Sequence, residues 1–334
     1  METKSNRFVE IKDIAKWYPY KSGKLFDFKH TGANRRYVKA VDGINLQVGR
    51  GEILGIIGES GCGKSTLGRM LTRLENPSRG DVFIDGVSTA HMLKEDPKRF
   101  RRMVQIVFQN PFDTFTPRDT IRKILLRPLK NHAIGRDEKE RLEIITKALE
   151  AGGLRPAEDI LQRYPHELSG GQLQRISIIR AMFLNPGFII ADEPVSMLDV
   201  SVRADIINML MELARSNNAA VVFISHDIAL TRYISDNIAV MYLGKVVEYG
   251  RADDVVKNPK HPYTQVLISN CASIDPSEER YLLPIEGEPP TPVNPGPGCY
   301  FAPRCFKACP DCFKAYPQVR TFKNGHTSVC SLAE

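Results

Sequence analysis

Three short motifs stand in one order along the chain and limit its fold more than any other feature. Residues 58–66 read Gly-Glu-Ser-Gly-Cys-Gly-Lys-Ser-Thr, residues 168–172 read Leu-Ser-Gly-Gly-Gln, and residues 188–193 read Phe-Ile-Ile-Ala-Asp-Glu. The first is a glycine-rich loop between a strand pattern and a helix pattern. The third is an apolar strand that ends in two carboxylates. A glycine-rich loop alone indicates a bound phosphate, and the two later motifs restrict what is done with it.

The loop at residues 58–66 has the spacing of a phosphate-binding loop. Its glycines let backbone N–H groups converge on phosphate oxygens, where side chains would block the approach. Lys64 is expected to contact the β- and γ-phosphates, and Ser65 to offer a hydroxyl to Mg²⁺. The helix that follows adds its positive N-terminal end. The predicted nucleotide contacts are Gly58, Ser60, Gly61, Cys62, Gly63, Lys64, Ser65 and Thr66.

The acidic strand supplies two carboxylates with separate roles. Asp192 is predicted to complete the Mg²⁺ shell, and Glu193 to polarise the attacking water. Two carboxylates after a strand are more often a solvated turn when they occur alone. Because the preceding run is apolar and a phosphate loop is already present, the catalytic interpretation is favoured here.

The motif at residues 168–172 fits the start of a helix. Ser169 is the expected N-cap, and the glycines after it expose backbone donors that suit an anion. A glycine-rich turn that merely opens a structural helix explains the same residues equally well.

From Lys39 to about Thr264 the chain resembles an ATP-binding cassette (ABC) ATPase, and Leu-Ser-Gly-Gly-Gln is highly specific to that family. The resemblance implies an α/β fold with a RecA-like parallel core, an antiparallel β subdomain and a helical subdomain. It also implies that two subunits clamp ATP between them. The residues it assigns to the nucleotide of a facing subunit are Ser169, Gly170, Gly171 and Gln172.

Further residues match the family's set one by one. Gln109 matches the Q-loop glutamine, which shares Mg²⁺ with Ser65 and Asp192 and links the site to a membrane subunit. His226 matches the switch histidine at the γ-phosphate, although a lone histidine after a strand is more often structural. Residues 196–199 resemble the D-loop, with Met197 where alanine is usual. The catalytic residues implied are Glu193, His226 and Gln109.

An early aromatic residue stacks on adenine in this family. Tyr18 is the best match, and Trp17 and Tyr37 are its rivals. An early aromatic residue is by default part of the core, so the residues alone leave the choice open.

Strand and helix patterns alternate along most of the chain, which implies a parallel sheet covered by helices on both faces. Residues 7–57 indicate antiparallel β structure, with strands at 8–11 and 44–48 and a loop over 20–36. Residues 93–165 form a helical insert. The other expected elements are helices at 66–74, 137–151, 173–183 and 201–215, strands at 187–191 and 220–225, and a last β segment over 238–248.

Five of the seven cysteines lie in the last tenth of the chain, after a proline-rich linker over residues 284–297. Such crowding favours a metal site over disulfides. The tail resembles the C-terminal extension of oligopeptide and dipeptide importer ATPases, a branch that includes nickel and oligosaccharide importers. We therefore expect an ATPase domain over 1–270 and the extension over 271–334. The ligand set implied for a [4Fe–4S] cluster, with Zn²⁺ or no metal as alternatives, is Cys299, Cys305, Cys312 and Cys330, leaving Cys309 spare.

Composition places the chain among soluble proteins. Hydrophobic residues make up 42% and charged residues 25%, and no apolar run is long enough to cross a bilayer. The first residues lack the apolar core of a signal peptide. The net charge of +7 is scattered, so no nucleic-acid partner is expected. A membrane association must therefore come through partner proteins.

The sequence thus predicts an ATP-hydrolysing motor subunit of an ABC importer at the cytoplasmic face of the inner membrane, most simply for di- and oligopeptides. The partners implied are a second, non-identical ATPase subunit, two membrane permease subunits and an extracytoplasmic solute-binding protein. Nickel or oligosaccharide import is an alternative with the same motor. Two further alternatives are a non-transport ATPase acting on DNA or ribosomes and an iron–sulfur-dependent regulator.

Overall fold

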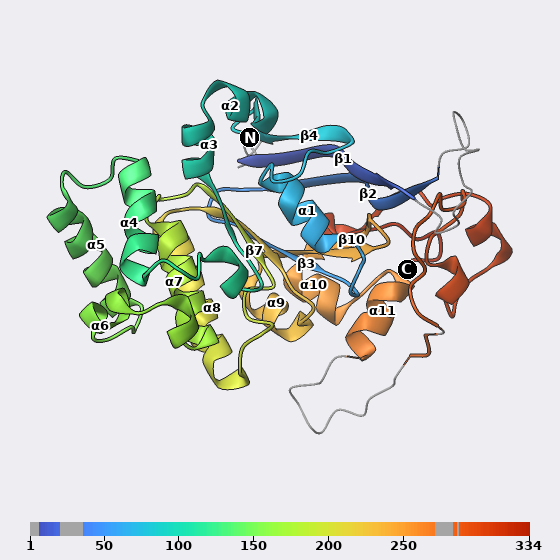
Figure 1. Ribbon diagram of the computed structural model, residues 1–334. Helices are drawn as coiled ribbons and strands as arrows, with labels where there is room; N and C mark the ends of the chain where they lie inside the picture. Colours follow the sequence, from blue (N-terminus) through green and yellow to red (C-terminus); the bar gives the residue numbers. More distant parts are fainter. Residues whose placement is uncertain (1–6, 21–35, 271–282, 286) are drawn as a thin grey trace, which may run out of the picture. The chain divides into compact units, whose positions relative to one another are not determined.

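The computed structural model describes residues 7–20, 36–270, 283–285 and 287–334 (Figure 1). They form two compact units. The first unit comprises Met1–Val9, Val48–Glu52 and Val87–Val222, and the second comprises Glu10–Gln47, Ile53–Gly86 and Phe223–Glu334, within the described ranges. The loop expected over 20–36 falls largely outside the described residues, as does Cys271.

Buried parallel strands form the centre of the first unit. Strand β6 (Val104–Val107) runs parallel to β7 (Phe188–Asp192), and β8 (Ala220–Ile224), which begins in this unit, lies on the other side of β7. Every residue of β7 is buried. A strand that is covered on both faces reads as a continuous apolar run, which is why the sequence predicted it. The longest segment of the unit, Val87–Val222, begins with a two-residue strand, β5 (Val87–Ser88).

Helices make up the rest of the first unit, and in Figure 1 the green helices α4, α5 and α6 gather beside α7. Their interior is an apolar cluster to which Leu125, Leu149 and Leu173 each contribute a fully buried side chain. The helices are α2 (Thr89–Glu95), α3 (Pro97–Met103), α4 (Ile121–Asn131), α5 (Glu138–Ala151), α6 (Ala157–Gln162), α7 (Gly170–Met182) and α8 (Val200–Ser216).

The helix expected over 137–151 is confirmed as α5. Asp137 is its N-cap, and the Asp137 carboxylate accepts a hydrogen bond from the backbone N–H of Glu140. Such a cap satisfies one of the backbone donors that the first turn leaves without a partner. Short 3₁₀ turns flank the helical cluster at Phe112–Thr114 and Pro165–Glu167.

The second unit contains two sets of strands. One has the order β2 (Tyr37–Val48), β1 (Val9–Pro19), β4 (Arg79–Ile84). The sequence predicted antiparallel strands in this part of the chain. The other has the order β11 (Arg320–Thr321), β12 (Thr327–Ser328), β10 (Lys245–Arg251), β9 (Asn237–Tyr242), β3 (Ile53–Ile57). Strands β3 and β9 are parallel, whereas β9, β10, β12 and β11 pair antiparallel. The second set is therefore mixed.

The prediction of a single β segment over 238–248 is wrong, because the chain reverses its direction within these residues and forms two strands, β9 and β10. Strands β9 and β10 form a hairpin whose turn residues, Leu243 and Gly244, have φ angles of 43° and 80°. Two consecutive positive φ angles are typical of the tight turns that join antiparallel strands. A Cβ at Gly244 would lie 2.7 Å from the carbonyl oxygen of Lys39, so only glycine fits this turn.

The helices of the second unit are α1 (Lys64–Leu71), α9 (Ile228–Ile234), α10 (Ala252–Lys257) and α11 (Pro262–Ser269). Helix α1 starts and ends earlier than the expected 66–74. It starts at Lys64 because Gly63, with φ of 106°, already ends the preceding loop, and it stops before Arg73, whose φ is 55°. The tail adds short turns at Ala302–Arg304, Pro310–Phe313 and Lys323–Gly325.

The proline-rich segment predicted as a linker is held along β2 over part of its length. The backbone N–H of Lys39 donates to the carbonyl of Pro292, and that of Asn294 donates to the carbonyl of Tyr37. Tyr37 in turn donates its N–H to the Asn294 side chain. These bonds occupy backbone groups on the edge of β2, which would otherwise be open to another strand.

One buried carboxylate joins β10, α11 and the tail. Glu248 is 1% exposed and accepts hydrogen bonds from the backbone N–H groups of Lys260 and His261 at 2.7 and 2.8 Å. His326 of the tail lies 2.7 Å from the same carboxylate. His261, the N-cap of α11, is also buried, and its Nδ1 accepts from the N–H of Tyr263. These three partners supply the polar contacts that a buried carboxylate needs.

Acid should destabilise the second unit through His261. Burial lowers its pKa from 6.5 to about 4, against the opposing influence of Glu248. Between these values the unfolded chain binds a proton that the folded protein does not, so stability is complete above pH 6.5 and falls as the pH drops toward 4. The expected loss is at most about 3 kcal/mol. Unfolding measured by urea titration at several pH values checks this.

His261→Asn is the matched variant, because asparagine keeps an N-cap acceptor and cannot titrate. Its stability should fall less steeply between pH 6.5 and pH 4 than that of the unaltered protein. Parallel curves for the two proteins would assign the acid sensitivity to other groups.

Candidate functional site

The glycine-rich loop lies in the second unit, between the end of β3 and the start of α1. Two of its glycines pass directly against neighbouring backbone. A Cβ at Gly58 would lie 2.2 Å from the carbonyl oxygen of Met241, and one at Gly63 would lie 2.1 Å from that of Ala40. Both have positive φ, 153° and 106°. The loop can therefore follow this path only because side chains are absent at these positions.

Lys64 is the first residue of α1 and is 5% exposed. Its ammonium group donates to the carbonyl oxygens of Gly58 and Glu59, at 2.8 and 3.0 Å. The group therefore lies over the hollow of the loop, where an anion held by the loop would meet it. Cys62 is buried beside it, and burial raises the pKa of this thiol.

Two distant residues hold Glu59 of the loop, and a third, Tyr242, contacts one of them; the sequence did not indicate any of the three. The hydroxyl of Tyr263 accepts a hydrogen bond from the Glu59 backbone N–H. Arg304, from the tail, donates to both carboxylate oxygens, and its guanidinium also lies 3.4 Å from the Tyr242 hydroxyl. These partners are about 180 to 245 residues away along the chain, so no local pattern connects them to the loop.

The three early aromatic residues differ in what surrounds them. The Tyr18 hydroxyl donates to Glu75 at 2.5 Å, and the Thr66 side chain, at the end of the glycine-rich loop, hydrogen-bonds it too. Burial and Glu75 raise the pKa of Tyr18 to about 12. Trp17 is occupied by the cations of Lys39 and Arg79, which lie 5.3 and 5.6 Å from its ring centre. Tyr18 is thus the one that contacts the loop and α1.

His226 is exposed and lies between the end of β8 and the start of α9. Its neighbours are fixed by two local bonds. The Ser225 hydroxyl accepts from the N–H of Asp227, and the Asp227 carboxylate accepts from the N–H of Leu230 as the N-cap of α9. A short capped turn therefore presents the imidazole at the end of the strand.

In the first unit, the structure brings together Gln109, Glu193 and Ser196. The Gln109 amide donates to the Glu193 carboxylate at 3.0 Å and to the Ser196 hydroxyl at 3.1 Å. The Ser196 hydroxyl donates to the Glu193 carbonyl at 3.1 Å. Asp192, the last residue of β7, is buried next to them.

Glu193 adopts a backbone conformation that is unfavourable for its residue type. Its φ is 47°, in the left-handed region of backbone conformation that residues other than glycine and asparagine rarely adopt. Such strain costs on the order of 1 kcal/mol and persists where surrounding bonds enforce it. Gln109 holds the Glu193 side chain and Ser196 holds its carbonyl oxygen, and strained residues of this kind are common at functional sites.

Ser169 is confirmed as the N-cap of α7. Its hydroxyl accepts from the N–H of Gln172, and the Gln172 side chain accepts from the N–H of Ser169, forming a capping box. A Cβ at Gly170 or Gly171 would make only ordinary contacts, the nearest at 3.4 and 3.8 Å. Packing within this chain therefore does not require glycine at either position.

The predicted site residues are divided between the two units. The second unit holds the glycine-rich loop, Tyr18 and His226, and the first holds Gln109, Asp192, Glu193 and residues 169–172. Within each unit the residues lie at strand ends or helix starts, as their patterns predicted.

The tail cysteines lie near one another. Burial raises the pKa of Cys299 to about 11, and raises those of Cys305 and Cys330, with Cys312 adding to each shift as a neighbouring thiol. Among the described residues, no group of three or more His, Cys, Asp or Glu side chains is placed to hold a metal ion. The expected ligand set, Cys299, Cys305, Cys312 and Cys330, is therefore not confirmed.

Cys309, expected to be spare, has its thiol in contact with that of Cys312. Its Sγ lies 3.5 Å from that of Cys312, and a hydrogen bond from Cys312 lowers its pKa.

None of the helices in the described ranges has the length and hydropathy needed to cross a bilayer.

Comparison with known proteins gives consistent matches. Residues 41–196 match the family model described as ABC transporter, and residues 247–312 match that of the oligopeptide/dipeptide transporter C-terminal region. The putative oligopeptide transport ATP-binding protein YkfD of Bacillus subtilis is 44% identical over 89% of this chain and 91% of its own length. The dipeptide transport ATP-binding protein DppF of Escherichia coli is 42% identical over 95% and 92%.

Solved structures agree with the sequence comparison. A dimeric ATP-binding cassette in a post-hydrolysis state with ADP and Pi has a TM-score of 0.62 and 29% identity, covering 73% of this chain and 98% of that one. A further dimeric structure of a bacterial ABC transporter cassette has a TM-score of 0.60 and 28% identity over the same shares.

The contacts of Tyr18 generate a prediction about adenine. Tyr18→Ala should weaken binding of a fluorescent ATP analogue about tenfold, because stacking of a base on an aromatic ring contributes roughly 1–3 kcal/mol. Tyr18→Phe keeps the ring, removes the bond to Glu75 and should bind nearly normally. Trp17→Ala is the matched control and should have little effect. A larger loss with Trp17→Ala than with Tyr18→Ala would transfer the assignment to Trp17.

Proposed function

The chain belongs to the ATP-binding subunits of ABC transporters, in the oligopeptide/dipeptide branch, and from this we infer that it is the motor subunit of a peptide importer. It hydrolyses ATP and couples the hydrolysis to transport. Relatives that match over more than nine-tenths of this chain are named for dipeptide and oligopeptide transport, which supports peptides as the cargo. Its place is at the cytoplasmic face of the membrane, bound through permease subunits.

The observation that carries the catalytic part of the proposal is the contact between Gln109 and Glu193. We propose that Glu193 takes the proton of the attacking water as general base, since its carboxylate is fixed at the end of β7. Gln109 holds that carboxylate and reports its position to the permease. Lys64 and the loop N–H groups stabilise the phosphate charge, and His226 contacts the γ-phosphate.

Magnesium fits the proposed donor set. Ser65 offers a hydroxyl, Asp192 a carboxylate and Gln109 an amide oxygen, and Mg²⁺ prefers hard oxygen ligands of these kinds. Bound with ATP, the ion would neutralise charge on the β- and γ-phosphates during transfer. The proposed nucleotide contacts in the loop are Gly58, Ser60, Gly61, Cys62, Gly63, Lys64, Ser65 and Thr66.

The assembly proposed is a pair of ATPase subunits on two permease subunits. Ser169, Gly170, Gly171 and Gln172 would face the nucleotide of the other subunit, where backbone N–H groups without Cβ atoms can approach phosphate closely. The absence of any need for glycine in this chain's own packing supports that role. Leu198 and Val202 lie beside Gly170 and Gly171. In the same segment the side chains of Met197 and Val200 are 61% and 78% exposed, as expected for apolar residues that a partner subunit covers.

Several finer features of the assembly stay proposals. The second ATPase subunit is proposed to be a different chain, and peptides are proposed to arrive on an extracytoplasmic solute-binding protein. The domain division into 1–270 and 271–334 is also proposed. No observation favours the regulator or the DNA- or ribosome-associated alternatives.

Glu193→Gln tests the catalytic assignment. The amide cannot take a proton from water, so ATP turnover by the assembled transporter should fall by about 10²- to 10⁴-fold. ATP binding should be retained, because the loop and Lys64 are unaltered. Phosphate release and analogue binding measure the two quantities separately.

Glu212→Gln, on an exposed part of α8, is the matched control and should hydrolyse ATP normally. Full turnover in the Glu193→Gln transporter would contradict the assignment. Loss of binding together with turnover would indicate a folding defect instead.

The iron–sulfur cluster stays a prediction from the sequence. The proximity of the four thiols supports it, whereas their arrangement in the structure does not. Protein purified without oxygen should contain iron and acid-labile sulfide in equal amounts if the cluster forms, and Cys312→Ser should remove both. Cys309→Ser, the matched control, should retain them. A colourless protein without iron rejects the cluster, and bound zinc selects the alternative.

A further inference from the structure

We propose that Arg304 of the cysteine-rich tail is a positioning residue for the phosphate loop, so that the tail sets the affinity of this chain for ATP. The inference rests on the proposed function, since it concerns the same nucleotide site. It assigns the tail a task at that site in addition to any metal it holds.

The guanidinium of Arg304 grips the loop directly. Its Nη1 donates to one carboxylate oxygen of Glu59 at 2.8 Å, and its Nη2 donates to the other at 3.1 Å. Two parallel bonds of this kind fix the orientation of the carboxylate as well as its distance. Arg304 is 8% exposed, whereas the Glu59 side chain is 25% exposed, so water reaches the pair mainly from the carboxylate side.

Arg304 is itself rigidly placed. Its Nη2 also donates to the carbonyl oxygen of Gly287 at 2.9 Å, and its guanidinium lies over the ring of Tyr242. Phe301, three residues earlier, packs edge-on against Tyr242 and Tyr263, with ring centres 5.3 Å apart in both cases. The tail therefore presents the guanidinium from a packed aromatic base and not from a mobile arm.

A second bond fixes the backbone of the same loop residue. The Glu59 N–H donates to the Tyr263 hydroxyl at 2.8 Å, and Tyr263 belongs to the aromatic group on which Phe301 packs. Glu59 is thus held by its side chain and by its backbone. Both holds pass through residues that contact the tail.

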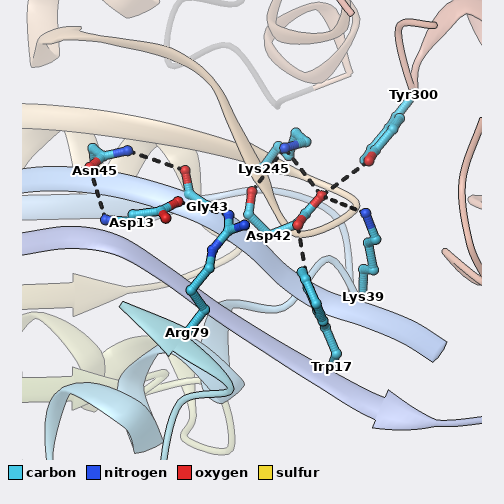
Figure 2. A network of polar contacts seen from close by, with 9 residues as sticks. All are labelled: Asp13, Trp17, Lys39, Asp42, Gly43, Asn45, Arg79, Lys245 and Tyr300. Atoms are coloured by element: carbon cyan, nitrogen blue, oxygen red, sulfur yellow. Dashed lines mark hydrogen bonds and ion pairs between the residues drawn. The ribbon is translucent and has the colours of Figure 1, made fainter. Parts of the chain in front are cut away.

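A second tail residue, Tyr300, is connected to the loop residue Cys62 through Asp42 and Gly244. Figure 2 shows the buried Asp42 carboxylate surrounded by Tyr300, Lys39, Lys245 and Trp17. Burial would raise the pKa of Asp42, but the charges of Lys245 and Lys39 outweigh it and lower the pKa. The Asp42 N–H donates to the Gly244 carbonyl, and the Gly244 N–H donates to the Cys62 carbonyl in the loop.

These contacts predict an effect on binding rather than on chemistry. A phosphate loop binds well when its N–H groups already point at the phosphates, because little order is then lost on binding. Releasing Glu59 lets the first turn of the loop move before ATP binds. Once ATP is bound, its phosphates restore the loop, so the hydrolytic step changes little.

The experiment is a double-mutant cycle on the full chain with Arg304→Ala and Glu59→Gln, read out by titration with a fluorescent ATP analogue. Each single variant should raise the Kd about tenfold, because a hydrogen-bonded charge pair contributes roughly this much. The double variant should be no weaker than either single one, since both remove one contact. Arg304→Lys, which keeps the charge without the paired bonds, should recover only part of the affinity.

Arg320→Ala is the matched control. Arg320 is another tail arginine, and its guanidinium donates to the carbonyls of Ser331 and Ala333 within the tail. Its removal should leave the Kd unchanged. In the assembled transporter, the KM for ATP should follow the Kd in the Arg304 variants, with kcat within about twofold of the unaltered enzyme.

Tyr263→Phe keeps the test valid if Arg304→Ala fails to fold, because it removes only the hydroxyl that accepts from Glu59; it should also raise the Kd. Unchanged affinity in the folded Arg304 and Glu59 variants overturns the inference. So do losses that add fully in the double variant, since these assign two unrelated effects. An unaltered chain that binds no nucleotide at all would refute the proposed function instead.

Discussion

The close approach of the phosphate loop to two backbone carbonyls is the constraint on which the second unit depends. Gly58 passes against Met241, and Gly63 passes against Ala40, at distances that exclude any side chain. The path of the loop therefore depends on the positions of β9 and β2, which belong to different sets of strands. The hairpin turn at Gly244, between β9 and β10, lies against Lys39 and Ala40 of β2. Residues nearly 200 positions apart are joined into one cradle.

Local patterns predicted those parts whose cause is local. The N-cap role of Ser169 follows from a side-chain oxygen placed beside the first turn of a helix, and it was predicted from the sequence. The helix over 137–151 was predicted too, although the cap role of Asp137 was not. The buried strand β7 was visible as an apolar run. The hairpin between β9 and β10 was not, because its turn has leucine before glycine where asparagine or aspartate would have marked it.

Long-range contacts explain the rest of the difference. No role was predicted from the sequence for Glu59 in the loop or for Arg304 beside Cys305. Nothing local indicates that the two meet, since the bond joins residues 245 positions apart. The hydrogen bond from Gln109 to the Glu193 carboxylate likewise joins residues 84 positions apart. The cysteines are the opposite case: their crowding suggested a metal site, and among the described residues no group of three or more His, Cys, Asp or Glu side chains is placed to hold one.

The space beside Gly170 and Gly171 means that a substitution there can affect the proposed function without affecting the folding of this chain. Alanine fits both positions without displacing a neighbour, and alanine is the better residue in a helix. A chain altered there would fold normally and take its place beside a partner subunit. In the composite arrangement proposed above, the damage would appear at the partner's nucleotide and the altered chain's own phosphate loop would be intact. In a mixed population, such a chain would inactivate the assemblies that it forms with a normal subunit.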